Sequence, residues 1–102
     1  MIFTRDLMEL VINGKKTQTR RLHKHILKEN NEYPLKWNWY DQTGRKIKII
    51  KCHPEKLGAI TLEDAKKEGF NSVEEFIEKW IKINKRWDPE TIVIVYDFQL
   101  VE

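Results

Sequence analysis

The stretch TIVIVYDFQLV, residues 91–101, carries the strongest fold signal in the sequence. Read as an extended strand, it places one set of apolar side chains on one face: Ile92, Ile94, Tyr96, Phe98 and Leu100. Val93 and Val95 make the other face apolar as well. A strand that is apolar on both faces in its first half is expected inside a sheet or barrel, with a helix packed on its outer side. The sequence therefore predicts an α+β fold with an antiparallel or mixed sheet.

Helix signals precede this strand. Asp6 and Glu9 have the spacing of a capping box, and Asn13-Gly14 ends the helix that they open. Thr61 is predicted to cap a helix over residues 62–68, which Gly69 closes. Ser72 and Glu75 are predicted to form a second capping box. The helix that they open has one apolar face, made of Val73, Phe76, Ile77, Trp80 and Ile81.

Between the helices the pattern predicts strands. Residues 1–4 resemble a short strand, and residues 35–40 and 46–52 form a predicted hairpin after a turn-rich connection at 29–34. Pro54 is expected to interrupt the strand pairing. Three aromatic side chains in this region, which belong to the core or offer a stacking surface for an unpaired base, are Trp37, Trp39 and Tyr40.

Length and composition limit the architecture. The chain has 102 residues, of which 40% are hydrophobic and 34% charged, and it contains no repeat or low-complexity linker. These values predict one globular domain, residues 1–102. The longest uncharged apolar run falls far short of a bilayer span, and no signal peptide opens the chain. Together with a single cysteine, Cys52, this predicts a soluble protein of the reducing cytoplasm.

Charge is distributed unevenly along the chain. Residues 1–51 carry a balance of +7, whereas the remainder carries −4. The segment from Asn13 to Lys28 contains six Lys or Arg residues and no acid. Such asymmetry predicts a basic face for an anionic partner.

The centre of this basic segment is the run NGKKTQTRR, residues 13–21. Backbone amides, hydroxyls and cations in one loop suit phosphate and nucleobase recognition, because Arg matches phosphate bidentately and Lys adds a point charge. The run is not a phosphate-binding P-loop, since its glycine follows a helix rather than a strand. The competing interpretation is a solvated basic loop in which Thr17 and Thr19 stabilise a turn.

The potential metal ligands are poorly placed for a shared ion. Cys52 and His53 are adjacent in a predicted strand and so point to opposite faces, and His23 and His25 are expected to be exposed loop residues. No metal site and no cofactor is expected.

The sequence resembles a known family at this point. Gly14-x-Lys16-x-x-Thr19-x-Arg21 matches the GxKxxTxR signature of ASCH domains, which belong to the PUA-like superfamily. The similarity continues along the chain through three further segments: Leu57-Gly58-x-Ile60-Thr61, Ala65-x-x-Glu68-Gly69-Phe70 with Phe76 and Trp80 behind it, and Val93-x-Val95-x-x-Phe98. The resemblance implies a small β-barrel of about five or six mostly antiparallel strands with flanking helices. It also implies a cleft where the signature loop meets the Glu-Gly-Phe segment.

Members of this family are proposed to bind RNA, and some small members are amidohydrolases that remove an acyl group from N4 of acylated cytidine. Carried over by motif, the proposed catalytic residues are Lys16, Thr19 and Glu68. The residues expected to contact RNA or a nucleoside surround them in the signature loop: Lys15, Thr17, Gln18, Arg20, Arg21 and Lys24.

Glu68 is also singled out by its position. A carboxylate in the last turn of a helix meets the negative end of the helix dipole, and this helix offers no neighbouring cation to compensate for it. The sequence thus favours a pair between Glu68 and Lys16 across the cleft, with a freely solvated Glu68 as the alternative. Thr19 is the candidate nucleophile, Lys16 its base, and a backbone amide of residues 14–19 a candidate oxyanion donor. Glu68 would orient the site or shuttle a proton.

Three functions fit these observations. The first is binding of RNA or of a modified nucleoside through the basic loop. The second is catalysis on N4-acylcytidine, or ribonuclease activity, by Lys16, Thr19 and Glu68. The third is a protein-interaction domain whose basic loop contacts an acidic partner. Salt-sensitive retention on RNA separates the first from the third.

Overall fold

The computed structural model describes residues 1–22, 26–38 and 40–101. Its elements, in chain order, are α1 (Arg5–Ile12), β1 (Gln18–Arg21), β2 (Glu32–Lys36), β3 (Gln42–Lys56), a 3-10 turn (Leu57–Ala59), α2 (Leu62–Lys67), α3 (Val73–Asn84) and β4 (Ile92–Val101). Among the described residues, no helix has the length and hydropathy that crossing a bilayer requires. Four residues singled out in the sequence lie outside the described residues: His23, Lys24, His25 and Trp39.

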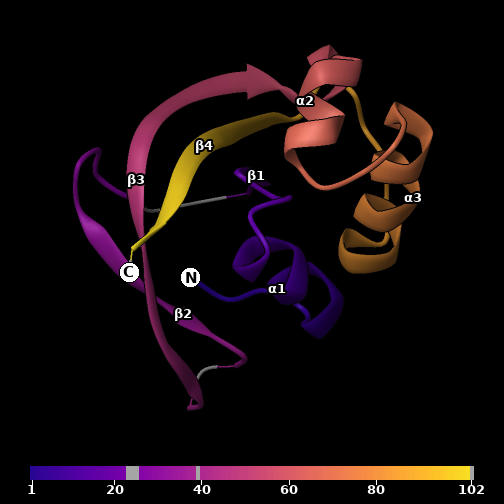
Figure 1. Cartoon of the computed structure of the whole chain (residues 1–102). Helices are drawn as coiled ribbons and strands as arrows, with labels where there is room; N and C mark the ends of the chain where they lie inside the picture. Colours follow the sequence, from indigo (N-terminus) through magenta and orange to yellow (C-terminus); the bar gives the residue numbers. More distant parts are fainter. Residues whose placement is uncertain (23–25, 39, 102) are drawn as a thin grey trace.

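The strands form one antiparallel sheet in the order β1-β4-β3-β2. Figure 1 shows β3 and β4 as long, curved strands with α1 on their concave side, while α2 and α3 lie together at one end. The sheet has four strands over the described residues and does not close, so the prediction of a barrel with five or six strands is not confirmed. Residues 1–4 form a single parallel bridge, Ile2 with Lys36, rather than a strand, because α1 begins at Arg5.

The two prolines that flank the predicted hairpin, Pro34 and Pro54, both lie within strands. β2 begins at Glu32, within the predicted turn, and it contains Pro34, which an edge strand tolerates. Pro54 pairs with Ile94 of β4, so the prediction that it interrupts the pairing is wrong. β2 covers β3 no further than Lys48. Among the described residues, one side of β3 therefore has no partner strand at Pro54, and an amide proton missing from that side costs no ladder hydrogen bond.

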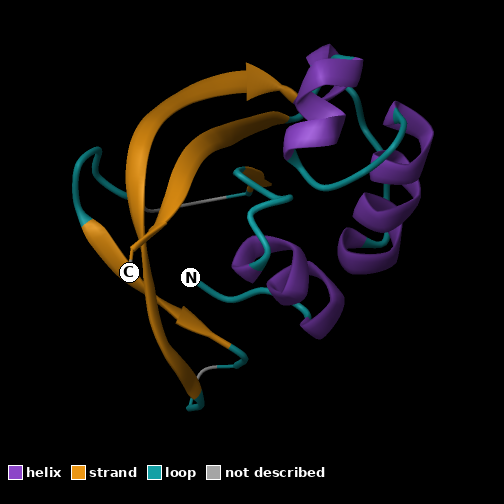
Figure 2. Cartoon of the chain, viewed as in Figure 1, coloured by secondary structure: helices purple, strands orange, loops and turns teal. Residues whose placement is uncertain are grey.

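β4 is shared by two hydrophobic cores, as its two apolar faces predict. On its concave side, Tyr96 and Phe98 pack against α1 and the inner faces of β2 and β3. The buried members of this first core are Phe3, Leu7, Met8, Val11, Leu35, Ile47, Ile49, Tyr96 and Phe98. On its other side, Val93 and Val95 pack beneath α2 and α3. The buried members of this second core are Leu57, Ile60, Ala65, Phe76, Trp80, Val93 and Val95. Figure 2 shows α1 within the curve of the strands, and α2 and α3 near the C-terminal end of β3.

The helix boundaries agree with the sequence signals in most places. Thr61 and Asp64 form a complete capping box on α2. Ser72 caps α3, but the Glu75 carboxylate accepts from Asn71, so the predicted second box is incomplete. The N-cap of α1 is Thr4 rather than Asp6.

Three further side chains predicted to be apolar anchors or a stacking surface are exposed. Ile81 of α3 is 42% exposed, although it was expected on the buried face. Trp37 is 40% exposed, with the Arg5 guanidinium 6.0 Å from its ring, and Tyr40 is 93% exposed. Neither aromatic residue belongs to the buried cores, so their stacking on a base stays a prediction.

Gly69 allows α2 to end tightly against α1. Its φ is +99°, and a Cβ atom at this position would lie 2.8 Å from Leu10 Cδ1. We expect Gly69→Ala to lower the free energy of unfolding by about 1–3 kcal/mol, since it adds backbone strain and a steric contact. Gly14→Ala is the matched control, because its φ is +76° and a Cβ there meets nothing within 4 Å. Urea unfolding of both variants measures the difference; equal losses would show that the contact with Leu10 does not matter.

Candidate functional site

The connection from α1 to β1 places Lys16 at the end of α2. The amides of Lys15 and Lys16 both donate to the carbonyl of Leu10, which turns the chain sharply after α1. The next amide, of Thr17, donates to the carbonyl of Lys67, and the Thr17 carbonyl accepts from Phe98. The signature segment is therefore bound to α2 on one side and to β4 on the other, and from Gln18 onward it is a strand rather than the loop predicted from the sequence.

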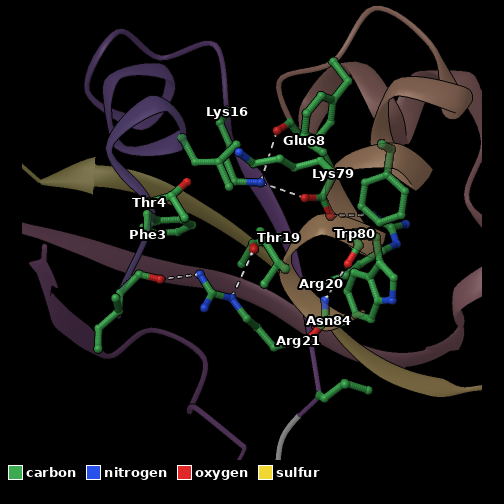
Figure 3. A pocket seen from close by; sticks show the side chains of 16 residues that line it. Phe3, Thr4, Lys16, Thr19, Arg20, Arg21, Glu68, Lys79, Trp80 and Asn84 are labelled. Carbon is green, nitrogen blue, oxygen red and sulfur yellow. Dashed lines mark hydrogen bonds and ion pairs between the residues drawn. The ribbon is translucent and has the colours of Figure 1, made fainter. Parts of the chain in front are cut away.

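Glu68 is the C-cap residue of α2 and forms an ion pair with Lys16. Lys16 Nζ donates to Glu68 Oε1 at 2.7 Å and to the Glu68 carbonyl at 3.1 Å, as Figure 3 shows. The ammonium also donates to the Gln18 carbonyl at 3.0 Å. Lys16 thus supplies the external cation that a carboxylate at a helix C-terminus requires. Both residues are 2% exposed, so the alternative of a freely solvated Glu68 is wrong.

Arg20 holds the second oxygen of the same carboxylate. Its Nη1 atom donates to Glu68 Oε2 at 3.0 Å and to Gln18 Oε1 at 2.6 Å. Its Nη2 atom lies 2.8 Å from Glu55 Oε2 on β3 and 3.2 Å from Asp64 Oδ2 on α2. One buried guanidinium therefore links β1, β3 and α2, and fixes the orientation of the carboxylate that faces Lys16.

Thr19 and Arg21 lie on the side of β1 that faces Phe3. Thr19 is 4% exposed, and its Oγ1 accepts from Arg21 Nε at 3.3 Å. The Arg21 guanidinium also donates to the Ile2 carbonyl at 2.9 Å and lies 4.7 Å from the centre of the Phe3 ring. These contacts hold the guanidinium over the aromatic ring and beside the hydroxyl.

These residues line one cavity of about 380 Å³ between α1, β1 and α3. The polar part of its lining consists of Thr4, Lys16, Thr19, Arg20, Arg21, Glu68, Lys79 and Asn84. The apolar part consists of Ile2, Phe3, Leu7, Leu22, Phe70, Phe76, Trp80 and Ile83. Lys79 of α3 forms an ion pair at 2.7 Å with Asp6 of α1, which links two helices that both contribute to the lining. A cavity that combines an apolar wall with several convergent polar groups has the character of a small-ligand site.

Burial lowers the pKa of the Lys16 ammonium below its usual value. The charge and hydrogen bond of Glu68 oppose this shift, while Arg21 and Arg20 add to it. Burial also lowers the pKa of Arg21. The site therefore contains a lysine that releases its proton more readily than a surface lysine does, with the acceptor carboxylate already in contact.

The structure brings together the three predicted catalytic residues, since Lys16, Thr19 and Glu68 all line the cavity. The predicted binding residues divide into three groups. Arg20 and Arg21 line the cavity, and Gln18 is buried beside them with its side chain bonded to Arg20 and Asp97. Lys15 and Thr17 are exposed outside the lining. Lys24 is outside the described residues.

Sequence reasoning did not assign Phe3, Lys79, Ile83 and Asn84 to the site, although they line it. Phe76 and Trp80 lie on the apolar face predicted for α3, and helical periodicity alone does not indicate that they also line a cavity. No group of three or more His, Cys, Asp or Glu residues suited to a metal ion occurs within the described part of the chain. His53 of the predicted Cys52-His53 pair is exposed and lies 3.9 Å from Glu55.

Comparisons with known proteins agree with the fold. The family profile described as ASCH domain matches residues 1–102. The structure is similar to that of an ASCH domain from Lactobacillus crispatus JV V101, with a TM-score of 0.75 and 12% identity over 93% of this chain and 70% of that one. It is also similar to hypothetical protein PH0355, with a TM-score of 0.73 and 17% identity over 99% and 96% of the two chains. Protein EF3133 from Enterococcus faecalis V583 gives a TM-score of 0.72 at 16% identity, over 94% of this chain and 67% of that one. A search of curated proteins finds no match.

Proposed function

Because the chain belongs to the ASCH domain family, we propose that it binds RNA by accepting an unpaired or modified nucleoside in the cavity lined by Lys16, Thr19 and Glu68. The observation that supports this proposal most directly is the combination of cations and aromatic rings around one small cavity. The volume of about 380 Å³ lies at the lower end of the range for small-molecule sites. It suits a single base with its sugar rather than a folded RNA element.

The chemistry of the lining is suited to a base. Phe3, Phe70 and Trp80 line the cavity, and stacking on aromatic side chains contributes about 1–3 kcal/mol per base. Arg21 is held on the cavity wall by its contacts with Phe3 and Thr19, so its remaining donors are preorganised for a base or sugar oxygen. Lys16 and Arg20 differ from Arg21 in that their charges are already balanced by carboxylates.

Nucleoside binding is tested by closing the cavity. Ile83 lines the cavity and is 49% exposed, so Ile83→Trp will fill its mouth without placing a polar group in a core. We expect calorimetric titration with N4-acetylcytidine and cytidine to show binding to the wild type and at least a tenfold weaker affinity for this variant. Ile81→Trp is the matched control, because Ile81 is a similarly exposed residue of the same helix that does not line the cavity. Equal affinities for both variants, or no binding of any nucleoside to the wild type, would contradict the proposal.

A second function, deacylation of an N4-acylated cytidine, is favoured by one further observation. A lysine with a lowered pKa shares the cavity with a buried threonine hydroxyl and has a carboxylate 2.7 Å away that can take its proton. After Lys16 passes a proton to Glu68, the neutral amine removes the Thr19 hydroxyl proton as Oγ1 attacks the acyl carbon. The bond from that carbon to N4 breaks, N4 takes the proton from Lys16, and the acyl group stays on Thr19 as an ester. Water then hydrolyses the ester, which returns the hydroxyl to Thr19.

A further inference from the structure

Three lysines lie in a row on one face of β3. Lys46, Lys48 and Lys51 pair with Val101, Gln99 and Asp97 of β4. The residues between them, Ile47 and Ile49, point into the concave core. The register shift between Ile49 and Lys51 adds one residue to β3, so that Lys51 returns to the same face as Lys48. The sequence spacing alone would have placed Lys51 on the opposite face from Lys48.

This face is the convex side of the sheet, in the half that none of the described helices covers. α2 and α3 pack over Val93 and Val95, near the far end of β3, and leave the half that contains the lysines open. Lys46 and Lys51 are exposed, and Lys48 is partly exposed. No ion pair within residues 1–22, 26–38 and 40–101 includes any of the three.

Three cations of the signature segment are, by contrast, not available to a polyanion. Lys16 and Arg20 are buried and bonded to carboxylates, and Arg21 is bonded to Thr19 and Ile2. Of the cations that the described residues present to solvent, the signature segment supplies Lys15, whereas β3 supplies Arg45, Lys46, Lys48 and Lys51. A surface hollow of about 610 Å³ opens at the end of the row, lined by Glu32, Gly44, Arg45, Lys46 and Val101.

We propose that Lys46, Lys48 and Lys51, together with Arg45, dock the phosphate backbone of single-stranded RNA on the convex face of β3. The row is linear, and its members are spaced by about 7 Å or more along the strand, which suits an extended polyanion better than a compact anion. Lysines act as point charges and read no base, so this surface binds without sequence preference. The proposal rests on the proposed function, in which RNA carries the nucleoside. β3 also connects the two regions, since its Glu55 contacts Arg20 of the cavity wall.

Fluorescence anisotropy with a labelled single-stranded RNA at several salt concentrations tests this surface. We expect the triple variant Lys46→Gln, Lys48→Gln, Lys51→Gln to bind at least about tenfold more weakly at low salt, and the slope of log affinity against log salt to be shallower by about 2. The matched control is the triple variant Lys66→Gln, Lys67→Gln, Lys82→Gln, which removes the same charge from exposed positions of α2 and α3. Equal losses in both triple variants would overturn the proposal, because net charge alone would then explain binding.

The outcomes separate this surface from the cavity. The β3 triple variant should bind N4-acetylcytidine as the wild type does, whereas Ile83→Trp should lose the nucleoside and keep most of its salt-dependent RNA affinity. If the wild type binds nucleoside but no RNA, the docking surface is wrong and the cavity proposal stands. If polyglutamate competes as well as RNA at equal charge, the surface serves an acidic protein instead, and the RNA assignment is overturned.

Discussion

Replacing Glu68 by glutamine is expected to lower the free energy of unfolding by about 3–5 kcal/mol, a large fraction of the stability of a small domain. Glu68 is the acidic partner of Lys16 at 2.7 Å, and both side chains are almost fully buried. Glutamine keeps the shape but leaves the Lys16 ammonium, which is almost fully buried, without a carboxylate partner. Urea unfolding followed by tryptophan fluorescence measures the loss.

Two comparisons make this result specific. Glu63→Gln changes an exposed carboxylate of the same helix and should shift stability by no more than about 0.5 kcal/mol. Adding Lys16→Met to Glu68→Gln removes the unpaired cation and should restore a large part of the loss. A double variant as unstable as Glu68→Gln would show that the cost arises from something other than the unpaired charge.

The loss of unfolding free energy in Glu68→Gln should also depend on pH. Burial holds the pKa of Lys16 below 10.5, and Glu68→Gln removes the contribution that raises it, so the pKa in the folded variant falls further. Between that pKa and 10.5 the unfolded chain binds a proton that the folded chain does not, so stability rises with pH in this window. The difference from the wild type should therefore be largest near neutral pH and should shrink as pH rises toward 10.5. A pH-independent difference would contradict this account.

Lys16→Met and Thr19→Ala are each expected to lower kcat/KM for deacylation of N4-acetylcytidine by about 10²- to 10⁴-fold, if the protein acts as a hydrolase. Lys16→Met removes the base and leaves Glu68 paired with Arg20, so the fold should persist. Thr19→Ala removes the nucleophilic oxygen, whereas Thr19→Ser keeps it and should retain most of the rate. Release of cytidine measured by chromatography gives the rates.

Lys15→Met provides the control for charge, since Lys15 is the exposed neighbour of Lys16 and lies outside the cavity lining.

The wild-type rate should rise with pH and reach its midpoint below the usual pKa of lysine, because the neutral amine of Lys16 is the active form. Undiminished activity of Thr19→Ala would exclude Thr19 as the nucleophile, and no turnover by the wild type would leave the binding function alone.

The sequence predicted the parts of this molecule whose causes are local or carried by a motif. The capped helix α2 follows from Thr61 and Gly69, and the central strand follows from the alternation within residues 91–101. The pair of Lys16 and Glu68 could be expected because an acid at a helix C-terminus needs an external cation and the family resemblance brings the two segments together.

Other features depend on distant partners and left no local signal. The ion pairs of Arg20 with Glu55 and Asp64 were not predicted, because these two acids lie far along the chain. Pro54 looked like a strand breaker because its tolerance depends on where β2 stops covering β3. The cavity walls were not predicted, since the apolar periodicity of α3 cannot distinguish a side chain packed in a core from one that faces an open cavity.

The position of β4 between two cores determines when these cores can form during translation. β4 packs against residues from α1 on one side and from α3 on the other, and it is the last strand in the sequence. During translation at about 5–20 residues per second, neither core can close until residues 92–101 have emerged from the ribosome. The nascent chain therefore exposes its apolar segments until synthesis has passed this strand, and it then gains both cores together.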